Sequence, residues 1–146
     1  MPTVSGSFSC NVNVQTAIAL SDQSNHDLGL AEISGIQKSS DENFNNASMT
    51  YWGITDLVEG RGTQRGYFAN VHGHEGDRDW GTFEGKVATK NNEVTVEGTF
   101  QFTGGSGKFK GITGNGTFQT KMTSPRTLEG SWQGVYTLAT AKAHAH

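Results

Sequence analysis

Residues 103–118 decide the fold of this chain, and they are TGGSGKFKGITGNGTF. On either side, residues 94–102 and 114–122 alternate apolar and polar side chains, as half-buried strands do. The connection between these strands is rich in glycine, which permits positive φ and close backbone approach. It also contains two apolar residues, Phe109 and Ile112. The sequence predicts a tight connection, with room for one helical turn, in which Phe109 closes one end of a β-structure.

A glycine-rich loop that carries lysine also suggests a phosphate-binding site. The P-loop pattern G-x-x-x-x-G-K-[ST] and the dinucleotide pattern G-x-G-x-x-G both lead into a helix, whose N-terminus binds the phosphate. Here Gly111 is followed by a strand pattern. The sequence therefore argues against nucleotide binding at this loop.

The same residues resemble a segment of the allene oxide cyclase and dirigent superfamily, and of related small bacterial barrel proteins. The resemblance is the pattern T-G-G-S-G-x-F-x-G-x-x-G over residues 103–114, and the flanking strand pattern extends it to Leu138. It implies an eight-stranded antiparallel barrel, often trimeric, that holds an apolar small molecule in its lumen. Plant members cyclise an oxylipin epoxide or steer a coupling reaction. The catalytic residues of those members match no motif in this chain, so none of their roles is carried over.

Composition and charge narrow the class of protein further. The chain has 146 residues, of which 33% are hydrophobic and 20 are glycine, and its net charge is −3. Low apolar content in short alternating runs suits strands better than a helix bundle. Scattered basic residues argue against a nucleic-acid partner, because phosphate neutralisation needs a basic face. We expect one barrel domain over residues 1–140 and a flexible tail over residues 141–146.

The sequence suggests neither a membrane partner nor a cofactor. No run is long enough for a transmembrane helix, and the N-terminus lacks the basic and apolar regions of a secretory signal. We therefore expect a cytoplasmic location. The single cysteine, Cys10, excludes an internal disulfide. It alternates with Phe8 and Val12, which favours burial over a role as nucleophile.

Eight alternating runs predict eight strands. They cover about residues 4–14, 28–38, 49–59, 63–72, 80–89, 94–102, 114–122 and 128–139. The triplet Gly, Ser or Thr, then an aromatic residue recurs five times, beginning at Gly6, Gly81, Gly98, Gly116 and Gly130. Glycine allows a strand to bend, and an aromatic side chain covers the bare backbone. These features predict an all-β, eight-stranded antiparallel up-and-down barrel. A flattened β-sandwich stays open as the alternative.

The alternation of side chains along each strand selects candidate catalytic residues. Glu32 shares a face with three apolar residues of its strand, and Arg65 shares one with Tyr67. A carboxylate inside a barrel is desolvated, which raises its pKa and suits it to acid–base catalysis. We expect Glu32, Tyr51 and Arg65 in the lumen as catalytic candidates, although for each of them alone a structural or surface role is the plainer explanation. The chain has no Ser-His-Asp arrangement with a nucleophile elbow.

Aromatic residues on the predicted inner faces suggest a flat, apolar ligand. Such residues either fill a small barrel or line a pocket inside it, and the sequence leaves both possibilities open. The candidate ligand-binding residues are Phe8, Tyr67, Phe83, Phe100, Phe118, Trp132 and Tyr136.

His72 and His74 form a weak candidate metal site. Two histidines separated by one residue lie on one side of a strand, as zinc ligands can. The plainer interpretation is that polar residues gather at a hairpin tip.

Two functions follow from these expectations. One is a cofactor-independent cyclase or isomerase acting on an apolar small molecule, suggested by the resemblance alone. The other is a lipocalin-like carrier or sensor that binds such a molecule unchanged. Apolar residues expected on outer faces, namely Ile33, Trp52, Ile54 and Phe68, further predict a homo-oligomer, either a dimer or a trimer.

Overall fold

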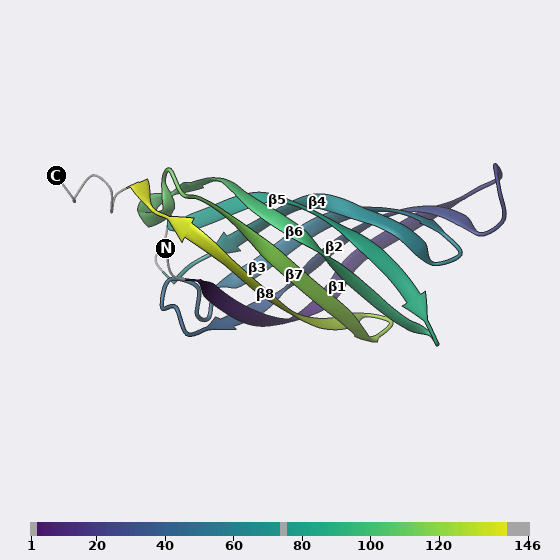
Figure 1. The fold of residues 1–146 in the computed structure, drawn as a ribbon, viewed down its shortest axis with the longest axis horizontal. Coiled ribbons are helices and arrows are strands. Elements are labelled where there is room, and N and C mark those ends of the chain that lie inside the picture. Colours follow the sequence, from purple (N-terminus) through teal and green to yellow (C-terminus); the bar gives the residue numbers. More distant parts are fainter. Residues whose placement is uncertain (1–2, 74–75, 140–146) are drawn as a thin grey trace.

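The chain forms a closed eight-stranded β-barrel in a computed structural model, which describes residues 3–73 and 76–139 (Figure 1). The strands are β1 (Val4–Leu20), β2 (His26–Ser39), β3 (Ser48–Val58), β4 (Arg61–Val71), β5 (Arg78–Lys90), β6 (Glu93–Ser106), β7 (Thr113–Ser124) and β8 (Thr127–Thr137). Each strand pairs antiparallel with the next, and β8 pairs with β1. The predicted up-and-down barrel is confirmed, and the sandwich alternative is wrong. The predicted tail, residues 141–146, lies outside the described residues.

The first two strands are longer than the sequence predicts. β1 continues past the expected end at Val14 to Leu20, and β2 begins at His26. The register between them shifts between Val12 and Val14. Such a bulge adds one residue to a strand and reverses which side chains face inward. Val14 and Ile18 continue the sequence parity of Val12, but because of the bulge they lie on the outer face and are 58% and 65% exposed.

Inside the barrel, glycines and aromatic rings lie opposite one another on neighbouring strands. Phe8 pairs with Gly130, and Phe100 pairs with Gly116. We expected the covering ring to come from the glycine's own strand. It comes from the adjacent strand instead, because directly opposed residues on one face of a sheet are the closest neighbours. Glycine thus leaves room for rings in a narrow lumen.

Replacing Gly116 with alanine should therefore destabilise the fold. A Cβ at this position would lie 2.1 Å from the carbonyl oxygen of Gln133 and 2.6 Å from Cζ of Phe100. Overpacking of this kind costs about 1–3 kcal/mol. We expect that loss in the free energy of unfolding measured with urea. Gly73→Ala is the control, because nothing lies within 4 Å of a Cβ there. Equal stability of the two variants would contradict the close packing.

One end of the barrel is closed by a cluster of apolar side chains, which we call the plug. The plug consists of Val4, Phe44, Phe102, Phe109 and Ile112. Phe109 ends the 3-10 helix η1 (Gly107–Phe109), between β6 and β7, and is only 1% exposed. Gly107 before it has a φ of 61°, a conformation that favours glycine. The prediction that Phe109 closes one end through a single helical turn is confirmed.

The opposite end carries a histidine between two carboxylates. The ring of His26 contacts Asp22 Oδ1 through Nδ1 at 2.7 Å and Asp56 Oδ1 through Nε2 at 2.6 Å. These hydrogen bonds, first that to Asp22 and then that to Asp56, raise the pKa of His26 above its ordinary value of 6.5. The hydrogen bond with His26 likewise lowers the pKa of Asp22 from 3.8. The cluster joins the tip of the β1–β2 hairpin to β3.

The stabilisation that this cluster provides should depend on pH. A raised histidine pKa contributes stability that is complete below 6.5 and is lost as the pH rises through the folded-state value. The lowered Asp22 pKa contributes above 3.8 and is lost on acidification. We expect His26→Gln to lower the melting temperature most at about pH 5.5 and least at about pH 9, with a smaller difference in high salt. A difference that stays constant across this range would contradict the ion pairing.

Candidate functional site

The lumen contains a cavity of about 80 Å³ below the plug. Aromatic rings form most of its wall. The lining residues are Phe8, Gln37, Phe44, Met49, Tyr51, Gln64, Phe68, Asn70, Phe83, Phe100, Phe102, Phe118, Thr120 and Trp132. For comparison, an engineered cavity of about 150 Å³ in another protein binds benzene. The lumen is therefore neither solidly filled nor large enough for a lipid-sized ligand.

The aromatic rings of the cavity wall pack against one another edge to face. Phe83 meets Tyr51 at a centroid distance of 5.5 Å and Phe118 at 5.7 Å, each with an interplanar angle of 88°. Phe68 and Phe100 meet in the same way at 5.9 Å. Edge-to-face pairs are stabilising beyond the area they bury. The apolar wall is thus held in a defined shape.

Two of the buried polar residues in the wall form no side-chain hydrogen bond to another described residue. They are Tyr51, a residue that is 7% exposed and carries a hydroxyl, and Gln64, a residue that is 8% exposed and carries an amide. Every fully enclosed polar side-chain atom of the described residues is paired, so these two groups open onto the cavity. Burial raises the pKa of Tyr51 far above its ordinary value, so its hydroxyl keeps its proton and can donate. The Gln64 amide can both donate and accept. The cavity therefore offers hydrogen bonds to an occupant.

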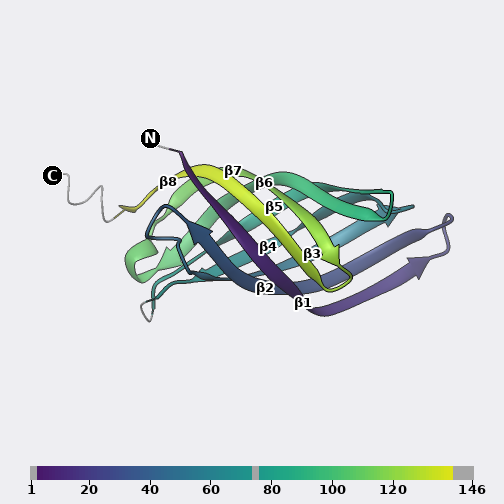
Figure 2. The ribbon, with the colours of Figure 1, turned by 90° about the horizontal axis from the view of Figure 1, so that it is seen from below.

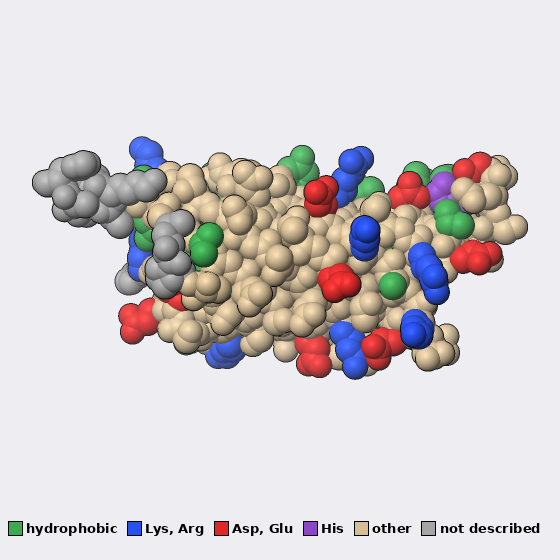
Figure 3. Space-filling model, in the orientation of Figure 1, with side chains coloured by type: hydrophobic (Ala, Val, Ile, Leu, Met, Phe, Trp, Pro, Cys, Tyr) green, Lys and Arg blue, Asp and Glu red, His purple; other side chains and the backbone are tan. Residues whose placement is uncertain are grey.

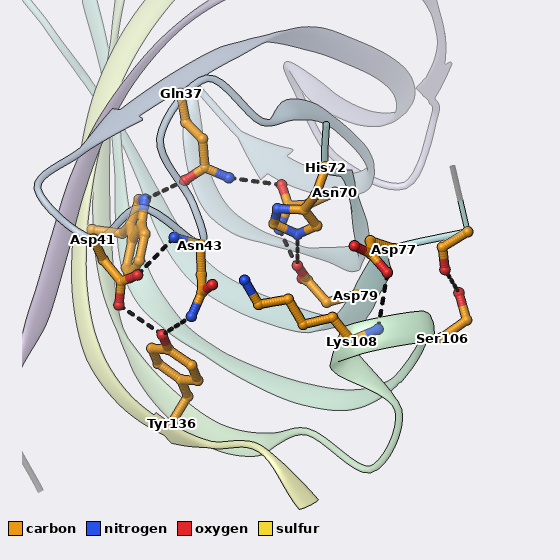
Figure 4. Close-up of polar contacts among 12 residues, drawn as sticks. Gln37, Asp41, Asn43, Asn70, His72, Asp77, Asp79, Ser106, Lys108 and Tyr136 are labelled. Carbon is orange, nitrogen blue, oxygen red and sulfur yellow. Dashed lines mark hydrogen bonds and ion pairs between the residues drawn. The ribbon is translucent and has the colours of Figure 1, made fainter. Parts of the chain in front are cut away.

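The plug end of the cavity is bounded by a row of buried hydrogen bonds, which we call the polar chain (Figure 4). Trp132 Nε1 donates to Gln37 Oε1 at 3.0 Å, and Gln37 Nε2 donates to Asn70 Oδ1 at 2.9 Å. Asn70 Nδ2 donates to Asp79 Oδ1 at 2.8 Å, and Asp79 Oδ2 lies 2.6 Å from His72 Nε2. The polar chain links β8, β2, β4 and β5. All of its groups are paired, so its role is to hold the strands together.

The loops around the plug are tied down by further hydrogen bonds, drawn in Figure 4. The backbone N–H of Lys108 donates to Asp77 Oδ1 at 2.9 Å, which fixes η1 against the β4–β5 loop. The hydroxyl of Tyr136 donates to Asp41 Oδ2 at 2.6 Å and accepts from Asn43 Nδ2 at 2.8 Å. Burial, followed by the bond to Asp41, raises the pKa of Tyr136 to about 12. Tyr136 therefore anchors the β2–β3 loop and does not line the cavity.

Of the two weak candidate metal ligands, His72 and His74, only His72 lies within the described residues, and its surroundings do not suggest a metal site. His72 is not at an exposed hairpin tip: its side chain is 7% exposed, and its ring stacks on Phe109 at 4.0 Å. Its Nε2 is paired with Asp79. Across residues 3–73 and 76–139, no three His, Cys, Asp or Glu side chains gather closely enough to hold a metal ion. His74 lies outside the described residues.

Only one of the three predicted catalytic residues lies in the lumen. Tyr51 faces inward, as expected. Glu32 lies on the outer wall, where it accepts a hydrogen bond from Trp52 Nε1 at 2.8 Å. Arg65 is also on the outer wall and exposed, opposite Ile54 and Glu84 on the adjacent strands. The predicted lumen positions of Glu32 and Arg65 were wrong, because the inward residues of β2 and β4 are those on the same face as the glycines of these strands.

Most of the aromatic candidates lie in the lumen, where they were expected. Of the seven candidate ligand-binding residues, the structure places five in the cavity wall: Phe8, Phe83, Phe100, Phe118 and Trp132. Tyr67 is 63% exposed on the outer wall, and Tyr136 is beside the plug. Ile33 and Phe68, expected outside, face inward, whereas Trp52 and Ile54 are exposed as expected. Cys10 is buried, which raises its pKa to about 11 and keeps the thiol protonated.

Sequence reasoning missed the polar residues of the lumen. These are Gln37, Gln64, Asn70 and Asp79, together with Phe44 of the plug. The sequence did carry a signal for these amides, namely the alternation of inward and outward side chains along a strand. Gln37 lies on the same face of its strand as Gly35, and Gln64 and Asn70 lie on the same face of theirs as Gly66. Because glycines mark the inner face of these strands, the amides had to point inward as well.

Comparison with known proteins adds no family to this description. No protein-family model matches the chain, and no curated protein matches it in sequence. Within the described residues, no helix is long and apolar enough to span a bilayer.

Proposed function

We propose that this protein binds a small, mostly apolar molecule with one hydrogen-bonding group in the lumen of its barrel, as a carrier or sensor that leaves the molecule unchanged. The observation that carries the proposal is that Tyr51 and Gln64, which form no side-chain hydrogen bond to another described residue, lie in a mostly aromatic cavity wall. A ligand's hydroxyl or carbonyl group could form a hydrogen bond with either side chain, which contributes about 0.5–1.5 kcal/mol.

Binding without chemical change is favoured over catalysis by the positions of the charged groups. Glu32 and Arg65 lie on the outer wall, and Asp79 is hydrogen-bonded to Asn70 and His72. Among the residues that line the cavity, only Tyr51 can ionise, and burial keeps it neutral. The resemblance of residues 103–114 to the allene oxide cyclase and dirigent group supports the location, since proteins of that group hold an apolar molecule in the lumen.

The size of the cavity limits the ligand. At about 80 Å³ the space suits a molecule of a few heavy atoms. Met49 lines the cavity, and its unbranched thioether can adopt other rotamers. A movement of Met49 would enlarge the space toward that needed by a single aromatic ring. We therefore propose short-chain alcohols, ketones and phenols as the ligand class.

Native mass spectrometry of the purified full chain would test for a co-purified small molecule, and calorimetric titration with phenol would measure binding directly. We expect Tyr51→Phe and Gln64→Leu each to weaken phenol binding about tenfold, or ~1.4 kcal/mol, through the lost hydrogen bond. Tyr67→Phe is the matched control, because this tyrosine is 63% exposed on the outer wall. It should bind as the wild type does.

Two results would overturn the proposal. The first is that no ligand binds while Tyr51→Phe and Gln64→Leu both gain stability, because the lumen would then be a core with two unsatisfied groups. The second is that chromatography after incubation shows that a bound molecule has been converted to a product. That result would favour the alternative that the protein is a cyclase or isomerase.

A further inference from the structure

The second half of β1 has a free edge. β1 pairs with β8 only from Val4 to Asn11, and the N–H of Val12 donates to the carbonyl of Arg126 in the β7–β8 turn at 2.8 Å. Beyond that point, residues 13–20 pair with β2 and with no other strand among the described residues. Figures 1 and 2 show this hairpin reaching further from the barrel than the others.

This edge lacks the features that keep strands from pairing with other chains. Exposed edges normally carry charged side chains or proline, or are interrupted by bulges. Residues 13–20 are NVQTAIAL, without charge or proline, and the first charged residue of the whole chain is Asp22. The bulge of β1 lies at the very start of the edge, between Val12 and Val14, and the pairing from Val14 to Leu20 is regular. The edge is therefore a ready template for another strand.

We propose that residues 14–20 pair antiparallel with the same residues of a second copy of this chain, about a two-fold axis at Ala17. This register places Val14 opposite Leu20 and Thr16 opposite Ile18 on the outer face. Val14 and Ile18 are 58% and 65% exposed in the single chain and would become covered. Figure 3 shows other hydrophobic side chains around this hairpin.

A second copy fits this edge because the pairing is self-complementary. A two-fold axis brings one surface patch against itself, so each contact occurs twice. Like charges do not oppose each other, since the paired segment is uncharged and Asp22 lies beyond it. A charged peptide from another protein would meet no complementary charge here.

The backbone N–H and C=O groups needed for this pairing point toward the free edge of β1. Residues on one face of a strand direct their N–H and C=O groups to the same side. Before the bulge, Val12 faces inward and donates away from β2. After the bulge, the inward residues are Gln15, Ala17 and Ala19, so their N–H and C=O groups point to the free edge. Pairing Gln15 with Ala19 and Ala17 with itself gives about six hydrogen bonds.

Light scattering and sedimentation of the full chain, from about 1 to 200 µM, would test the dimer. We expect a mass of twice the 15.7 kDa of one chain. Ala17→Pro removes an N–H that β2 does not use, so the mass should fall to 15.7 kDa with an unchanged circular dichroism spectrum. Ile18→Lys should do the same. Ile36→Lys is the matched control: Ile36 is 53% exposed on the outer face but away from the free edge, and this variant should stay dimeric.

Cysteine substitution would test the register. In the Ala17→Cys variant the two introduced thiols would face each other across the axis within disulfide range, so this variant should cross-link rapidly with diamide, whereas Ile36→Cys should not. The native Cys10 is 3% exposed and does not interfere. A wild-type monomer over the whole concentration range, a trimer, or dissociation by Ile36→Lys but not by Ala17→Pro would each overturn the proposal.

Discussion

Replacing Phe109 with alanine is expected to lower the free energy of unfolding by about 3–5 kcal/mol, because truncating a fully buried phenylalanine removes its contacts and leaves a cavity. Phe109 is 1% exposed. Its ring stacks on His72 at 4.0 Å and packs on Phe44 at 5.9 Å. Because η1, the β2–β3 loop and the β4–β5 loop all meet at this ring, its loss should loosen the whole plug. Urea titration followed by tryptophan fluorescence measures the change.

Tyr67→Ala is the control for the Phe109 variant. It also truncates an aromatic residue, but one that is 63% exposed on the outer wall. Surface changes of this kind cost about 0.5 kcal/mol. If both variants lost the same stability, the plug would contribute no more than an exposed ring, and the assignment of this end as closed would fail.

The success of the fold prediction has a physical basis in the pairing of glycines and rings. In a small closed barrel, an aromatic ring that crosses the lumen needs a residue without a side chain opposite it. The triplets at Gly6, Gly116 and Gly130 therefore indicate a closed barrel. Each faces a ring on the neighbouring strand in the structure. The place of Phe109 in the plug was likewise predictable, because it is one of two apolar residues in a glycine-rich connection.

The same glycines explain why Glu32 and Arg65 were misplaced. β2 carries apolar residues on both faces, and Leu28, Leu30 and Ile36 made the outer face look like the core. All three are exposed. Had Gly35 and Gly66 been used to mark the inner face, as glycine does in the triplets, Glu32 and Arg65 would have been assigned to the outer wall.

The polar chain could not be predicted from sequence. The four strands that it joins carry Gln37, Asn70, Asp79 and Trp132, and only Asn70 and Asp79 are near each other along the sequence. Their contact depends on the register that closes β8 onto β1 and on the positions of the loops at the plug end. Alternation specifies which face a side chain takes, but not its height in the barrel relative to a distant strand.

Replacing Asp79 with alanine is expected to cost about 3–5 kcal/mol of stability, since removing one partner of a buried pair leaves the others uncompensated. Asp79 is 0% exposed and binds both Asn70 and His72. Urea titration measures the loss, and Asp27→Ala, a change at an exposed carboxylate, is the control and should cost about 0.5 kcal/mol.

A double-mutant cycle separates the pair from the packing around it. If His72 and Asp79 act as a unit, His72→Ala in the Asp79→Ala background should cost less than it does in the wild type, by about 1–3 kcal/mol. His72 also stacks on Phe109, and that part of its contribution should persist in both backgrounds. Strict additivity of the two substitutions would show that the 2.6 Å contact contributes nothing to stability. The closed end would then be held by the apolar plug and the remaining hydrogen bonds of the polar chain.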